Sequence, residues 1–314
     1  MKRNQKATSF SEHRLAMALI AVLVFGGSFA AFYMAGLGKL AVEDGPLDAK
    51  RDAGSTHHLA PVNVSVIAEK VLPASGFVSK IRWGDAIPKL VGLGVINKTR
   101  FARSVSLTPA ELAVLDAPSD ERIRINENTS WFTVTVLWPL GIANKNPILE
   151  KNGMAGPDVD YYASTGGWTL GNKEGGGAYY NKYELITLTP EQQELAEYVA
   201  DRVFRPCCNN PTSFPDCNHG AAMLALIELG ASQGLTKEEL FEEALHFNSF
   251  WFPQTYLETA IYFEAAKGIS WEQVGSEEIV GKDYSSGSGS IATSRALQKM
   301  NITLSGGGGG SCSA

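Results

Sequence analysis

Three of the four cysteines of this 314-residue chain stand between positions 207 and 217, with a histidine two residues further on. Cys207, Cys208, Cys217 and His219 form the pattern Cys-Cys-x8-Cys-x-His. Thiolates and a neutral imidazole are donors that zinc and copper prefer in proteins. The two prolines of the intervening segment allow the loop to fold back on itself. The spacing therefore predicts a zinc or copper site made by these four residues.

Other chemistry also fits the same cysteines. Neighbouring Cα atoms lie about 3.8 Å apart, below the usual 4.4–6.8 Å of a disulfide, so Cys207 and Cys208 make a poor bridge with each other. Cys217 paired with either of them would give a structural disulfide in an oxidising compartment. A third hypothesis is an enzyme that uses the thiols, either a thiol–disulfide oxidoreductase or a cysteine hydrolase, because Cys217 precedes a predicted helix whose N–H groups favour thiolate. The sequence leaves these alternatives open and singles out no catalytic residue.

Polar residues inside the cluster have a different predicted role. Asp216, Asn218 and Asn209 are typical of turns and of side chains that hydrogen-bond to a site without being ligands. The fourth cysteine, Cys312, lies in a glycine-rich tail at 305–314. Ten extended residues span up to about 33 Å, so we expect Cys312 to act as an additional ligand or as a resolving thiol for the cluster.

The N-terminus carries the sequence pattern of a membrane anchor. Residues 1–14 form a basic tail, and residues 15–38 contain no charged side chain. In a helix, 24 residues rise about 36 Å, enough to cross a hydrocarbon core of about 30 Å. We therefore predict an uncleaved signal-anchor helix at 15–38 in the inner (cytoplasmic) membrane, with the membrane as a partner. Because basic flanks stay in the cytoplasm, the rest of the chain is predicted to be extracytoplasmic.

The remainder of the chain is predicted to be one large domain on a stalk. Residues 39–60 have too little apolar content for a core and are predicted to form a flexible stalk. Residues 61–304 are predicted to form an α-rich α+β domain of mainly α class, with a mixed first half at 61–180 and a helical, cysteine-containing half at 181–304. The net charge of −6, with no stripe of lysine and arginine, argues against nucleic-acid binding.

Helix-start signals recur along the domain. Thr108-Pro109-Ala110-Glu111 and Thr189-Pro190-Glu191-Gln192 share a threonine cap, a proline at the first helical position and Glu or Gln at the third, and Thr236 with Glu239 repeats the capping box. Further predicted elements are helices at 190–204, 219–229, 237–250 and 254–266, a strand at 123–125, and a strand or buried helix at 131–138.

The cysteine run resembles a known group of proteins. The segment from Arg205 to Gly220, with STGGWTLG at 164–171 before it and FWFP at 250–253 after it, is similar to uncharacterised membrane-anchored bacterial proteins that carry a CCNNPTxFPDCNHG-type motif. The resemblance covers about residues 72–265 and implies the same layout, and no activity is assigned to that group. Residues 216–222 also resemble the start of the catalytic helix of papain-like cysteine peptidases. Those enzymes use a histidine on a strand, whereas His246 is predicted to be helical.

Overall fold

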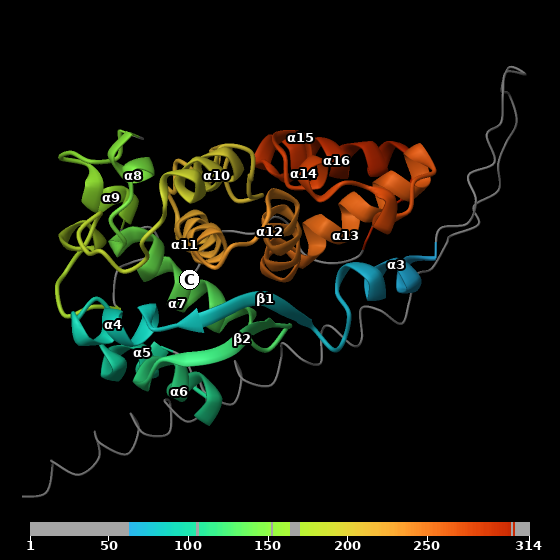
Figure 1. Cartoon of the computed structure of the whole chain (residues 1–314). Helices are drawn as coiled ribbons and strands as arrows, with labels where there is room; N and C mark the ends of the chain where they lie inside the picture. The colour runs from blue at the N-terminus through green and yellow to red at the C-terminus, as the bar shows by residue number, and fades with distance from the viewer. Residues whose placement is uncertain (1–62, 105–106, 152, 164–169, 303, 305–314) are drawn as a thin grey trace, which may run out of the picture. The chain divides into compact units, whose positions relative to one another are not determined.

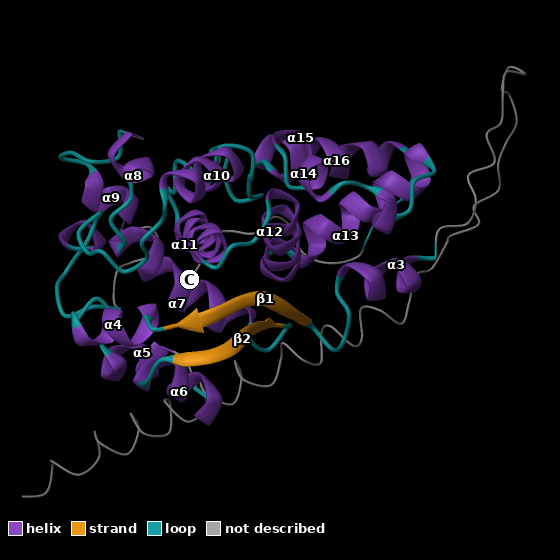
Figure 2. Ribbon diagram, viewed as in Figure 1, coloured by secondary structure: helices purple, strands orange, loops and turns teal. Residues whose placement is uncertain are grey.

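Helices predominate in this protein. The computed structural model describes residues 63–104, 107–151, 153–163, 170–302 and 304, and all of these except Leu304 fall in one compact unit. Within them, the strands form one two-stranded sheet beside many helices (Figure 1, Figure 2), so the predicted mainly α class is confirmed. The predicted span at 15–38, the stalk and the tail with Cys312 lie outside the described residues. No helix within the described ranges is long and apolar enough to cross a bilayer.

The connections between the elements differ in length, and a long loop at residues 201–217 joins α10 to α11. The first part of the chain contains α3 (Val64–Val71), β1 (Phe77–Gly84), α4 (Ala86–Gly92), α5 (Lys98–Ser104), α6 (Pro109–Asp116), β2 (Ser119–Ile125), α7 (Ser130–Ala143), α8 (Pro147–Lys151), α9 (Val159–Ala163) and η1 (Gly176–Ala178). The second part contains α10 (Pro190–Ala200), α11 (Asn218–Ser232), α12 (Lys237–Trp251), α13 (Pro253–Tyr262), η2 (Phe263–Lys267), η3 (Trp271–Gln273), α14 (Ser276–Ile279), α15 (Lys282–Ser285) and α16 (Gly287–Lys299).

Strands β1 and β2 pair antiparallel, with Phe77 opposite Ile125 and Arg82 opposite Arg122. Alternate residues of β1 are buried, as a sheet with one covered face requires. Helix α12 is fixed to β1 by the buried carboxylate of Glu243, which accepts hydrogen bonds from the hydroxyl of Ser79 at 2.6 Å and the backbone N–H of Lys80 at 2.7 Å. The strand predicted at 123–125 is confirmed as part of β2.

The centre of the fold is the contact between α7 and α11. The ambiguous run at 131–138 is helical, because it continues to Ala143 as one buried apolar segment. At Gly141 a Cβ atom would stand 1.8 Å from the carbonyl oxygen of Ala221. Only glycine therefore allows these two helices to lie so close, and α11, which starts at the cysteine site, is held rigidly against the core.

One ionisable side chain lies within this core. Glu228 of α11 is fully buried, and its Oε2 atom accepts a hydrogen bond from Nδ2 of Asn144 at 3.0 Å. Its Oε1 atom has no hydrogen-bond partner among the described residues. Burial raises the pKa of Glu228 to about 8, and the neighbouring side-chain amides of Asn144 and Asn146 lower it by less. The carboxyl group is therefore mostly protonated at neutral pH.

The capping predictions are confirmed, and the structure corrects one helix end. Capping boxes start α6 at Thr108, α10 at Thr189 and α12 at Thr236. Helix α10 ends at Ala200 instead of about Phe204, because the backbone oxygen of Val203 accepts from Thr212 and the chain turns into the cysteine loop.

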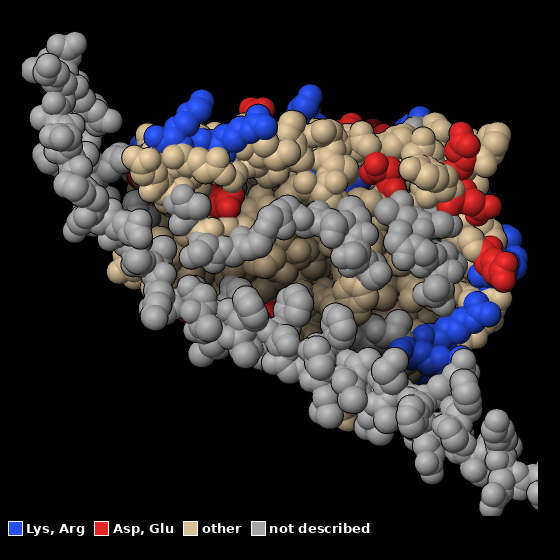
Figure 3. All heavy atoms as spheres, turned by 180° about the vertical axis from the view of Figure 1, so that it is seen from behind, with Lys and Arg blue, Asp and Glu red and all other residues tan. Residues whose placement is uncertain are grey.

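Apart from buried exceptions such as Glu228 and Glu243, charged side chains lie on the outside of this unit. On the face shown in Figure 3, basic and acidic residues lie near one another along the upper edge and at the right-hand end, and the visible centre is mostly neutral. Exposed ion pairs such as Lys70 with Glu272 at 2.8 Å and Lys151 with Glu197 at 2.9 Å each contribute about 1 kcal/mol or less. Stability therefore rests chiefly on the apolar core.

Candidate metal centre

The loop at residues 201–217 joins α10 to α11 and is tied to both sides. The backbone N–H and the hydroxyl of Thr212 both donate to the carbonyl of Val203 at 2.9 Å, and the N–H of Ser213 donates to Ala200 at 3.1 Å. From α12, Nδ2 of Asn248 donates to the carbonyl of Phe204 at 3.0 Å. The loop that holds the cysteines is thus fastened by its neighbours rather than left to fold by itself.

The start of α16 fixes the cysteine pair from the other side. The N–H of Gly287 donates to the carbonyl of Cys208 at 2.7 Å, and the N–H of Ser288 donates to Oδ1 of Asn209 at 2.8 Å. A Cβ at Gly287 would stand 3.3 Å from the carbonyl oxygens of Cys208 and Pro206, so a side chain there would crowd the loop. Residues nearly eighty positions away in sequence therefore set where the two cysteines lie.

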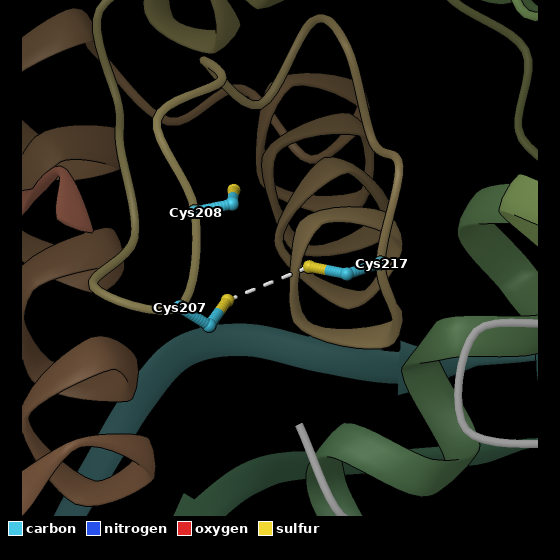
Figure 4. A group of neighbouring side chains, drawn as sticks. All are labelled: Cys207, Cys208 and Cys217. Atoms are coloured by element: carbon cyan, nitrogen blue, oxygen red, sulfur yellow. Dashed lines mark hydrogen bonds between the residues drawn. The ribbon is translucent and has the colours of Figure 1, made fainter. Parts of the chain in front are cut away.

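The sulfur atoms of Cys207, Cys208 and Cys217 all lie within 4.8 Å of one another. The sulfurs of Cys207 and Cys217 are 3.5 Å apart, and Figure 4 shows them directed toward each other, one from the loop and one from the start of α11. In a tetrahedral zinc site with bonds of about 2.3 Å, two sulfurs stand about 3.8 Å apart. The observed separations are therefore close to those that one metal ion requires.

A buried arginine supports this cluster. Arg205 is fully buried, and its Nε donates to Sγ of Cys217 at 3.3 Å. Its terminal nitrogens donate to the carbonyls of Asn210 at 2.9 Å and Phe214 at 3.0 Å, and to the carboxylate of Asp216. Burial acts to lower the pKa of Arg205, but the cysteine sulfurs outweigh it and keep the pKa above its ordinary value. The guanidinium is thus a fixed positive charge beside the three sulfurs.

The surroundings of Cys217 stabilise negative charge on its sulfur. Cys217 is the N-cap of α11, and its Sγ accepts from the N–H of Gly220 at 3.4 Å as well as from Arg205. The positive end of the helix dipole lies at the same point. A Cβ at position 220 would stand 2.5 Å from the guanidinium carbon of Arg205, so a larger residue would require Arg205 to shift.

Cys208 has different surroundings. Its Sγ lies 3.7 Å from Oδ1 of Asp216 and 3.9 Å from the carbonyl oxygen of Asn210, so the thiol donates to acceptors. The hydrogen bond with Cys207 lowers the pKa of Cys208, but the interaction with Cys217 and burial outweigh it and raise the pKa to about 12. A metal ion that binds this sulfur must displace its proton, so binding at this position releases a proton.

His219 lies outside the group of three sulfurs. Cys217 is the N-cap of α11 and has an extended backbone, whereas His219 lies within the first turn of the helix. The ring of His219 contacts Phe252 at 4.6 Å and Trp251 at 5.9 Å between centroids, and its buried Nδ1 has no hydrogen-bond partner among the described residues. Burial lowers the pKa of His219 to about 4, so the ring is neutral. The structure thus brings together three of the four predicted ligands.

Sequence reasoning missed Arg205 as a member of the site. The available signal was a basic residue two positions before the paired cysteines, and its burial depends on the fold of the whole loop. Of the three polar residues predicted to hydrogen-bond around the site, Asp216 accepts from Arg205 and from Nδ2 of Asn210, and Asn209 accepts from Ser288. The side-chain oxygen of Asn218 instead accepts from the backbone N–H of the next residue, His219, at 3.0 Å. Arg205 donates to Asn210, Phe214 and Asp216 of the same loop and so helps to hold the cysteines together.

No family model matches the chain, and neither a curated protein nor a solved structure does so. The similarity to membrane-anchored bacterial proteins stays a prediction. The function of the site therefore has to be inferred from its own chemistry.

Proposed function

We propose that this protein binds one thiophilic transition metal ion, zinc or copper, through Cys207, Cys208 and Cys217. The observation that carries the proposal is the convergence of three sulfurs, all within 4.8 Å of one another, from two separate segments. Three thiolates with a divalent ion have a net charge of −1. The buried guanidinium of Arg205, bonded to one of these sulfurs, offsets that charge.

The burial of the ligands favours an ion that exchanges with the surroundings. Cys217 is 5% exposed, whereas Cys207 and Cys208 are only half-buried, so one side of the cluster faces outward. Structural zinc sites are closed by four protein ligands, and sites with three protein ligands accept a further ligand. A carrier or sensor role fits this arrangement better than a purely structural one. We propose water or Cys312 as the fourth ligand.

Metal analysis of the purified chain tests this proposal. After incubation with zinc or copper(I) under reducing conditions and removal of excess ion, we expect about one ion per chain. Cys217→Ser should lose most of the ion, and His219→Ala should keep most of it. Cys312→Ser separates the two candidates for the fourth ligand, because metal affinity should fall in this variant only if Cys312 takes that place. A wild-type chain that retains neither ion, or cysteine variants of the cluster that retain a full complement, would refute the proposal.

We further propose that the segment at 15–38 anchors the metal-binding domain in the inner membrane. The support is its lack of charge over 24 residues behind a basic tail. Alkaline carbonate extraction tests this, since the full chain should stay in the membrane pellet and a chain that lacks residues 1–38 should appear in the supernatant. Release of the full chain would rule out a transmembrane anchor.

A further inference from the structure

Among the cysteines that the structure describes, Cys207 and Cys217 are poised for bond formation. Their sulfurs are 3.5 Å apart and directed at each other (Figure 4), and a disulfide bond of about 2.05 Å needs only a small approach. The vicinal pair Cys207–Cys208 is disfavoured by its short Cα separation. The sulfur of Cys208 instead contacts the carboxylate of Asp216 and the carbonyl of Asn210.

The two members of the pair differ in the way that thiol–disulfide exchange requires. Cys207 is half-buried on the loop and lies where an external reagent can reach it. Cys217 is buried at the N-terminus of the 15-residue helix α11, and its sulfur accepts hydrogen bonds from Arg205 and from the N–H of Gly220. In thiol–disulfide exchange, the first cysteine must be accessible to the external disulfide, and the second cysteine attacks faster when its sulfur has more thiolate character. The geometry thus gives the two sulfurs separate tasks.

We propose that Cys207 and Cys217 form a reversible disulfide by exchange with an external low-molecular-weight disulfide, and that this oxidation expels the metal ion from the site. In the first step, the Cys207 thiolate attacks one sulfur of the reagent, R–S–S–R. A bond forms between Sγ of Cys207 and that sulfur, the S–S bond of the reagent breaks, and one RS⁻ leaves.

In the second step, the Cys217 thiolate attacks Sγ of Cys207 and displaces the second RS⁻. Two cysteine thiolates are thereby oxidised to one disulfide, and the reagent disulfide is reduced to two thiolates, which take up the protons that the cysteines gave to water. Two of the three metal donors are lost in this reaction, because disulfide sulfurs are poor ligands compared with thiolates. Cys208 alone is too few ligands to retain the ion. The proposed release of the metal ion rests on the proposed metal-binding function, whereas the proposed disulfide exchange does not.

Oxidised glutathione is a suitable probe, and full-length chain with Cys312→Ser is the background that confines reactive thiols to the cluster. Reduced, metal-free protein is treated with the probe, and its disulfides are mapped by peptide mass spectrometry over time. We expect a Cys207–Cys217 disulfide as the major product. With Cys217→Ser added, a mixed disulfide with glutathione should persist at Cys207. With Cys208→Ser added, the same intramolecular disulfide should form at a rate within about threefold.

Several results would overturn the exchange proposal. One is an intramolecular disulfide that involves Cys208, and another is a first mixed disulfide that forms on Cys217. A third is the absence of any intramolecular disulfide in the chain whose three cluster cysteines are unsubstituted. The disulfide map of the chain with all three cluster cysteines tests the exchange proposal even if a variant with a substituted cluster cysteine fails to fold. With metal-loaded protein, release should follow disulfide formation in time, and reduction should restore binding. Release without the disulfide, or the disulfide with full retention of metal, contradicts the switch. If the chain forms the disulfide but never binds metal, metal binding and metal release are refuted and the disulfide exchange is not.

Discussion

The buried carboxyl of Glu228 makes the stability of this protein depend on pH. Glu228 lies in the α7–α11 contact, where one oxygen is bonded to Asn144 and the other has no partner among the described residues. Its pKa is raised from 4.5 to about 8, chiefly by burial. Between these two values the folded chain holds a proton that the unfolded chain has released. The free energy of unfolding therefore falls as pH rises, by about 1.4 kcal/mol per pH unit.

Glu228→Gln removes this titration while keeping a side chain of nearly the same shape. The stabilising contribution of the proton is fully present below pH 4.5 and is lost as the pH rises toward 8. At pH 7 the loss is on the order of 3 kcal/mol, and above pH 8 it levels off near 5 kcal/mol. Because the amide does not titrate, the stability of the variant relative to wild type should rise as the pH rises from 4.5 to 8, by about 3 kcal/mol at pH 7 and about 5 kcal/mol above pH 8.

Urea unfolding from pH 5 to pH 9, compared between wild type and Glu228→Gln, measures the effect. The difference in free energy of unfolding should grow with pH to about pH 8 and then stay constant. Glu194→Gln, on the exposed face of α10, provides the same substitution at the surface and should show no such trend. A difference between wild type and Glu228→Gln that is the same at pH 5 and pH 8 would refute the reasoning.

Three further predictions concern the loop, the helix start and the topology. In chemical unfolding, Arg205→Met should lower the free energy of unfolding by about 3–5 kcal/mol, because Asp216 and two carbonyls lose their partner. In the same assay, substitution of the exposed Arg202 by Met should lower it by about 1 kcal/mol or less. Gly220→Ala raises helix propensity by about 1 kcal/mol, yet it should lower the melting temperature and metal content, since the added Cβ displaces Arg205; a more stable variant would show that the guanidinium moves freely. A membrane-impermeant maleimide should label Cys312 in cells with a permeabilised outer membrane, and labelling only after rupture of the inner membrane would contradict the predicted orientation.

Local signals in the sequence were sufficient for much of the helical framework. Threonine and proline at Thr108-Pro109 and Thr189-Pro190 act within one turn of helix, so the starts of α6 and α10 follow from neighbouring residues alone. The run that begins at Trp131 was ambiguous, because a segment buried on all sides has no periodicity that separates a strand from a helix. Strand β1 was missed for a related reason, since its buried face is partly polar and includes Ser79, whose hydroxyl is bonded to a distant glutamate.

The site was predictable in part. Three cysteines within one loop were enough to predict that their sulfurs meet. His219 was predicted to join them, but its ring packs against Phe252 and Trp251, a tertiary contact that no local pattern describes. The role of Arg205 depends on four groups that the loop brings around it, and its neighbours in sequence do not indicate this. Likewise, the contact of Gly287 with Cys208 joins two segments far apart in the chain, which no local pattern describes.

X-ray absorption at the metal edge tests the central claim most directly, because it counts the atoms around the ion. Full-length chain loaded with one equivalent of zinc should show three sulfur neighbours at about 2.3 Å, with one light atom or a fourth sulfur completing the site. Cys207→Ser should reduce the sulfur count by one, and His219→Ala should leave the spectrum unchanged. A spectrum with only nitrogen and oxygen neighbours, or a sulfur count that survives substitution of the cluster cysteines, would contradict a metal site at Cys207, Cys208 and Cys217.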